Sequence, residues 1–108
     1  MGKTKHKWWG YVKAVIRDYP EHCENIARPQ LEKRESDAVA RAIEATLLLR
    51  NGAERMELLD MVFFQKSYSL EGAAAARFVS YETAKRWHGD FITMVAAEMG
   101  LCAKPDKT

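Results

Sequence analysis

The chain has 108 residues, of which 47% are apolar and 30% are charged, and its formal net charge is +2. This length supports one domain spanning residues 1–108 and excludes a multidomain enzyme. The balance of apolar and charged residues is typical of a soluble folded protein rather than a disordered one. Positive charge is concentrated at the start, since residues 1–19 hold five Lys or Arg and one Asp. We expect the two ends, 1–6 and 103–108, to be flexible.

Several classes of protein are excluded by what the sequence lacks. No apolar run approaches the roughly 18 residues that cross a membrane. The basic start runs into Trp8-Trp9 without the apolar core of a secretory signal. Cys23 and Cys102 stand far apart, which matches neither a disulfide framework nor a zinc site and favours a reducing compartment. We therefore expect a cytoplasmic protein with no metal, no cofactor and no membrane contact.

The first half of the chain predicts helices and no strand. Residues 7–18 carry apolar side chains at helical spacing, and Pro20 is expected to end this helix. A second helix is predicted from Pro29 to Arg50. Either Asn51 or Gly52 is expected to adopt the left-handed conformation directly after it. The unusually apolar segment 53–65 predicts a third helix that is buried on more than one side. A homodimer surface is the alternative use of its Met and Phe side chains.

The segment from about 69 to 100 predicts two helices joined by a tight turn. Ser69 is expected to cap a short helix of about eight residues, and Ser80 a long one from position 81 to about 99. Small residues are expected where the two helices cross, and Ala74 and Ala84 meet that need. The sequence therefore predicts an all-α, compact bundle of about five helices that ends in a helix–turn–helix with a long recognition helix.

The predicted long helix combines an apolar stripe with a polar, partly basic opposite face. Such a helix reads the major groove through exposed residues in its first turns, while neighbouring groups contact phosphates. Arg and Lys donate to guanine edges, and Glu accepts from cytosine. The candidate contacts to double-stranded DNA are Arg77, Ser80, Tyr81, Glu82, Thr83, Lys85 and Arg86, with Lys7 and Lys13 added by the first helix.

No constellation in the chain indicates catalysis. His88 lies close in sequence to Asp90, but no second residue stands at the spacing of a metal ligand or a catalytic base with a motif around it. We expect the protein not to be an enzyme, and we name no catalytic and no metal-binding residue.

Three segments of the chain resemble one known family. The run Ser80-Tyr81-Glu82-Thr83-Ala84-Lys85-Arg86-Trp87-His88-Gly89-Asp90-Phe91 resembles the recognition helix of phage-encoded transcriptional regulators of the RinA/ArpU type. Lys7-Trp8-Trp9-Gly10-Tyr11-Val12-Lys13 resembles the basic, tryptophan-rich opening of that family, and residues 51–55 and 59–63 resemble its middle helices. The resemblance covers most of the chain. It implies a phage or prophage protein in a bacterial host cell that binds promoter DNA in the manner of a sigma factor and activates late genes.

Two turn residues depart from the pattern of that family, and two other functions stay open. Phe78 stands where glycine is frequent, and Arg77 stands where an apolar residue is usual, so we expect Phe78 to pack where a smaller residue would sit. One alternative function is that of a phage small terminase subunit in DNA packaging. The other is that of an adaptor that contacts RNA polymerase without reading DNA.

Overall fold

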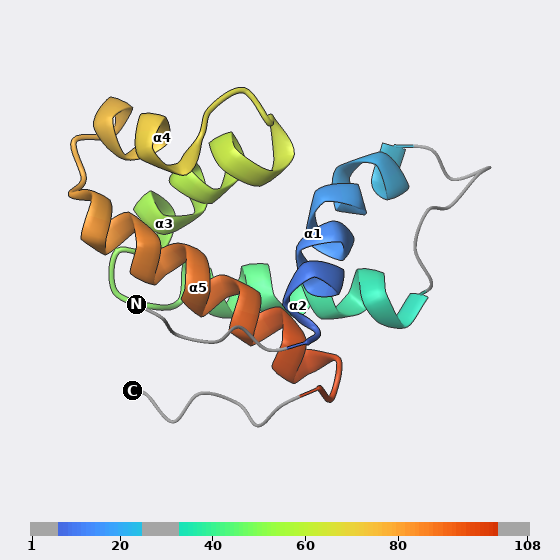
Figure 1. The fold of residues 1–108 in the computed structure, drawn as a ribbon. Coiled ribbons are helices and arrows are strands. Elements are labelled where there is room, and N and C mark those ends of the chain that lie inside the picture. Colours follow the sequence, from blue (N-terminus) through green and yellow to red (C-terminus); the bar gives the residue numbers. More distant parts are fainter. Residues whose placement is uncertain (1–6, 25–32, 102–108) are drawn as a thin grey trace.

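The computed structural model describes residues 7–24 and 33–101, and the regular structure in these residues is helical (Figure 1). The predicted all-α bundle is confirmed for this part of the chain, whereas the ends expected to be flexible, 1–6 and 103–108, lie outside it. No helix in the described part is long and apolar enough to cross a membrane. The elements are α1 (Trp9–Glu24), α2 (Lys33–Leu47), α3 (Gly52–Leu59), a π-helical turn η1 (Asp60–Phe64), α4 (Leu70–Ala76) and α5 (Tyr81–Glu98).

Helix α5 is the centre of the bundle, and the other four α-helices all pack against it. Figure 1 shows it running across the molecule, with α4 near its N-terminal end. The predicted apolar stripe is confirmed, because each of its five side chains is at most 6% exposed. These five are Ala84, Trp87, Phe91, Val95 and Met99.

Helix α1 continues to Glu24, so the prediction that Pro20 ends it is wrong. Proline removes one intrahelical hydrogen bond, the one that its own N–H would donate to the carbonyl four residues earlier. The preceding turn is held by the core instead, because Ile16 is fully buried and the Tyr19 ring lies 6.1 Å from that of Phe64. Tertiary packing thus outweighs the local preference of proline.

Helix α2 ends at Leu47, three residues before the predicted Arg50, and its predicted start at Pro29 lies outside the described residues. Leu48 is 87% exposed in the turn that follows. The predicted left-handed residue is present, since Asn51 has a φ of 60°. The chain reverses early because α3 packs directly against α2, with Gly52 buried between the two helices.

The predicted third helix over 53–65 forms as α3 followed by η1, with its last turn widened. The Gln65 N–H donates to the Asp60 carbonyl at 2.8 Å, a bond that spans five residues instead of four. Two adjacent aromatic rings of this turn face different elements. Phe63 is fully buried beside Phe91 of α5, whereas Phe64 faces Tyr19 of α1. The expected burial on more than one side is therefore confirmed.

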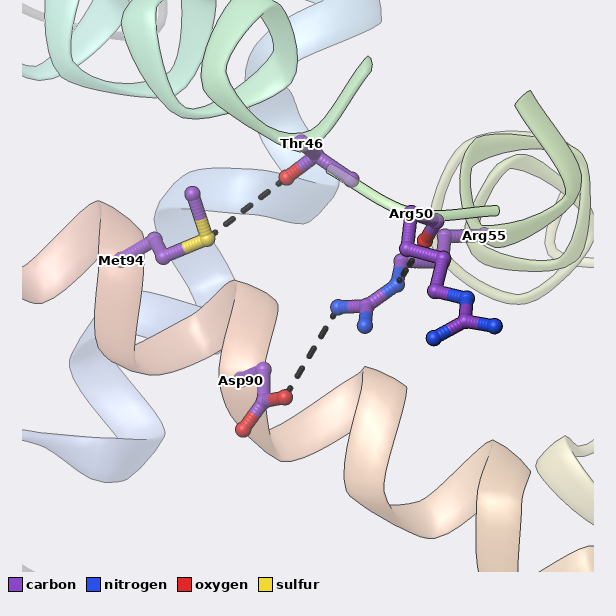
Figure 2. Close-up of polar contacts among 5 residues, drawn as sticks. All are labelled: Thr46, Arg50, Arg55, Asp90 and Met94. Atoms are coloured by element: carbon purple, nitrogen blue, oxygen red, sulfur yellow. Dashed lines mark hydrogen bonds and ion pairs between the residues drawn. The ribbon is translucent and has the colours of Figure 1, made fainter. Parts of the chain in front are cut away.

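Polar contacts join α2 and α3 to α5 at the middle of the bundle (Figure 2). The Thr46 hydroxyl donates to the Met94 sulfur at 3.7 Å. The Arg55 guanidinium donates to the carbonyl of Arg50 at 3.2 Å and lies 3.8 Å from the Asp90 carboxylate. These contacts fix the rotation of α5 about its axis and hence which of its side chains face solvent.

Candidate nucleic-acid interface

Both predicted serine caps of the α4–α5 segment are confirmed. The Ser69 hydroxyl accepts the Gly72 N–H at 3.0 Å, and the Ser80 hydroxyl accepts the Thr83 N–H at 3.1 Å. Ser80 also donates to the Thr83 hydroxyl at 2.9 Å. These bonds satisfy backbone donors that a helix start leaves without intrahelical partners, and they set the first residue of α5 at Tyr81.

The turn between α4 and α5 has the geometry of a helix end closed by a left-handed residue. The Val79 N–H donates to the Ala74 carbonyl at 2.9 Å, and Phe78 has a φ of 59°. This is the bonding of a Schellman motif, in which glycine is the usual left-handed residue. Phe78 is 96% exposed, so the expectation that it packs in the helix crossing is wrong. The left-handed backbone directs its side chain away from that crossing.

Small residues fill the contact between α4 and α5, as predicted. Ala74 and Ala84 are 2% and 0% exposed, and Ala73 on the adjacent position of α4 is also fully buried. Side chains of this size let two helix backbones approach closely. The crossing needs no contribution from Phe78.

The first two turns of α5 present a group of exposed side chains. Tyr81 is half-exposed, and Glu82, Lys85 and Arg86 are exposed. The Lys85 ammonium lies 5.3 Å from the centre of the Tyr81 ring, a cation–π distance. Within the part of the chain that the structure describes, no carboxylate pairs with Arg86. This face can donate hydrogen bonds and carry positive charge outward.

The candidate phosphate contacts beside that face have partners inside the protein. Arg77 forms an ion pair with Glu57 of α3, which ties the turn to the bundle. Ser80 and Thr83 bond to each other in the cap. Any contact of these three residues with a phosphate therefore competes with, or adds to, a bond that already exists.

Helix α1 brings only one of its two candidate lysines to this face. Lys13 is half-buried beside the start of α5, whereas Lys7 is exposed ahead of α1. Trp8 and Trp9 stack with their ring centres 6.0 Å apart. Both indoles are half-buried, so neither is fully in the core.

A pocket of about 300 Å³ separates α1 from the first three turns of α5. Trp9 and Lys13 of α1 and Leu70 of α4 line it from outside α5. The α5 side is lined by Tyr81, Lys85, His88 and Gly89. The pocket thus joins Lys13, Tyr81 and Lys85, three residues that the sequence indicates separately as DNA contacts.

Trp9, Leu70, His88 and Gly89 also line the pocket, although the sequence pattern does not indicate them as parts of a site. A partial signal exists, because Trp9 and Lys13 are four residues apart and so share a face of α1, as Tyr81, Lys85 and His88 do on α5. The pairing of those two faces depends on long-range packing. His88 also stacks on Phe63 at 5.1 Å, and no group of three His, Cys, Asp or Glu suited to a metal occurs among the described residues.

No protein-family model, curated protein or solved structure matches the chain.

Proposed function

We propose that the protein is a sequence-specific, double-stranded-DNA-binding transcriptional regulator of phage or prophage origin, and an activator of late genes. In this proposal α4 and α5 form a helix–turn–helix, and α5 is the recognition helix. The mechanism is binding alone: phosphate contacts hold the register, and the exposed side chains of the first turns of α5 read base edges. The resemblance to the RinA/ArpU regulators supports the phage origin and the role in transcription.

One observation carries the proposal. The first two turns of α5 expose Glu82, Lys85 and Arg86 on one face, while the opposite face of the same helix is buried and α4 crosses it through alanines. A helix held in this way presents its side chains in a fixed orientation, which reading of the major groove requires. The combination of two basic groups and one carboxylate suits base edges better than a uniformly basic face does.

The proposal is tested by selecting bound fragments from a random-sequence duplex pool and sequencing them. We expect one enriched motif, with an affinity that falls steeply as salt rises. A symmetric motif would indicate a dimer, and an asymmetric one a monomer. Binding without an enriched motif would contradict sequence-specific regulation and favour a role in packaging. Absence of binding at low salt would overturn the proposal.

Substitutions on α5 test which residues read the motif. We expect Arg86→Ala to weaken binding to the selected duplex by about 1–3 kcal/mol and to relax the preference at one base pair. Arg34→Ala is the matched control, because Arg34 is also exposed but lies on α2. Equal effects of the two substitutions on specific binding would contradict a reading role for α5.

An adaptor that contacts RNA polymerase is a second candidate, and the nearly complete exposure of Phe78 favours it. Exposed aromatic side chains are frequent anchors of protein interfaces. Phe78→Ala would then weaken binding to polymerase in a pull-down with the purified enzyme, while binding to the selected duplex stays unchanged. Arg86→Ala is expected to do the opposite if DNA reading is the function.

A further inference from the structure

The pocket between α1 and α5 has the chemistry of an anion site. Two lysines from different helices line it, Lys13 of α1 and Lys85 of α5. None of its lining residues is an Asp or a Glu. Lysine ammonium groups are compact point charges that bind phosphate without demanding one geometry. Lys13 also has a partner within the protein, so a phosphate would compete with that contact or add to it. A recess lined by two lysines favours a phosphate group as the occupant.

The position of the pocket favours a phosphate of the DNA backbone over a free anion. Tyr81 and Lys85 line it at the edge of the face of α5 on which Glu82 and Arg86 are proposed to read bases. A duplex docked on that face carries its phosphates past both edges of the helix, since a recognition helix lies between two phosphate backbones. Helix α1 forms the opposite wall of the pocket and so meets one of those backbones.

We propose that Lys13 and Lys85 hold one and the same DNA backbone phosphate in this pocket, with Trp9 and Tyr81 as its walls. This inference rests on the proposed DNA-binding function. It adds to that function a clamp between α1 and α5, in which the first helix positions the recognition helix on the duplex.

The test is a double-substitution cycle read as the salt dependence of binding to a duplex of about 20 base pairs. Each phosphate that a protein neutralises adds close to one unit to the slope of log affinity against log salt. If the two lysines share a phosphate, either one still neutralises it alone. Lys13→Ala and Lys85→Ala should then each change the slope little, and the double variant should lower it by about one unit.

Arg17→Ala combined with Lys85→Ala is the matched control, because Arg17 lies one turn beyond Lys13 on α1 and outside the pocket. In this double variant the change in slope should equal the sum of the changes in the two single variants.

A second pair of variants tests the charge of the pocket without removing a lysine. A Cβ at Gly89 would meet Trp9 at 3.8 Å, an ordinary contact, so the backbone there tolerates a side-chain Cβ. Gly89→Glu and Gly89→Gln then introduce side chains of nearly equal size that differ in charge. We expect Gly89→Glu to lower the slope by about one unit, because its carboxylate competes for the lysines, and Gly89→Gln to keep it.

Three outcomes would overturn the inference and leave the proposed function in place. The first is a slope that falls by about one unit in each single lysine variant and by about two units in the double variant. This result would assign Lys13 and Lys85 to separate phosphates. The second is a slope that Lys13→Ala leaves unchanged both in the otherwise unsubstituted protein and in the Lys85→Ala variant. This result would show that α1 does not contact the phosphate. Saturable binding of inorganic phosphate at the Gly89 amide, undisturbed by added duplex, would assign the pocket to a free anion. Absence of duplex binding by the unsubstituted protein would overturn the proposed function itself, and the inference with it.

Discussion

Phe78 combines a left-handed backbone with an almost fully exposed aromatic ring. A left-handed conformation costs a residue with a side chain about 1–2 kcal/mol. The Schellman bonds of the turn offset part of that cost, but the ring adds no packing, since the side chain is 96% exposed. Strained residues are frequent at functional positions. Phe78 is therefore the residue of the α4–α5 turn whose substitution best tests a contact with another molecule.

Phe78→Gly should raise the free energy of unfolding by about 0.5–1 kcal/mol, because glycine adopts the left-handed conformation without strain and loses part of that gain to its freer unfolded chain. Urea denaturation followed by circular dichroism measures the change. Phe78→Ala is the control, since alanine keeps the strain and the lost ring makes few contacts, and its stability should stay close to that of the unsubstituted protein. A destabilised glycine variant would show that the ring contributes packing.

At the same scale, helical periodicity predicts which helix residues are exposed, whereas the partners of a side chain depend on long-range packing. The exposed positions of Lys85 and Arg86 follow from helical periodicity once the buried stripe is recognised. The ion pair of Arg77 with Glu57 could not be predicted, because it depends on how α3 packs beneath the turn. The contribution of Trp9 to the pocket depends in the same way on where α1 meets α5.

Among the helices, those with local signals form as predicted, and those shaped by neighbours do not. Ser69 and Ser80 cap their helices through bonds to residues three positions later, so the sequence contains the whole interaction. The continuation of α1 through Pro20 and the widened turn η1 depend on rings that arrive from other elements. No local window contains those rings.

Whether a helical glycine can be replaced by alanine depends on the elements packed against it, as Gly89 and Gly52 show. Gly89→Ala in α5 should stabilise the protein by about 0.5–1 kcal/mol, because alanine favours the helix and the added Cβ meets only an ordinary contact. Gly52→Ala should destabilise it by about 1–3 kcal/mol or more, because its Cβ would lie against the carbonyl oxygens of Thr46 and Leu47. Thermal unfolding of the two variants measures the contrast. A tolerated alanine at position 52 would show that α2 and α3 can move apart.

For the whole molecule, the burial of side chains is unevenly distributed among the helices. Helix α5 contacts every other α-helix and buries aromatic and branched side chains along its length. Helix α4 has seven residues, and its buried side chains are Ala73 and Ala74. A short helix with little buried apolar surface opens at lower free energy than the core does. The proposed DNA-binding unit thus joins the most and the least firmly held helices.

Native-state hydrogen exchange should reveal this difference. We expect the amides of α4 to exchange through a local opening, and those at the centre of α5, around Phe91, to exchange only by global unfolding. Saturating duplex should slow exchange in α4 if the helix is ordered by binding. Equal protection of the two helices in the free protein would show instead that they unfold as one unit.

The π-helical turn η1 also determines where the chain can change its length. Its bond from Gln65 to Asp60 encloses one more residue than an α-helical turn does. Deleting one of the apolar residues of η1 would convert the turn to α-helical geometry. The residues before and after the turn would keep their positions, and the protein would lose the packing of one apolar side chain. The same deletion within α5 would rotate all later residues by about 100° and turn the core stripe toward solvent. Deletion of one residue should therefore be tolerated at η1 and rejected in α5.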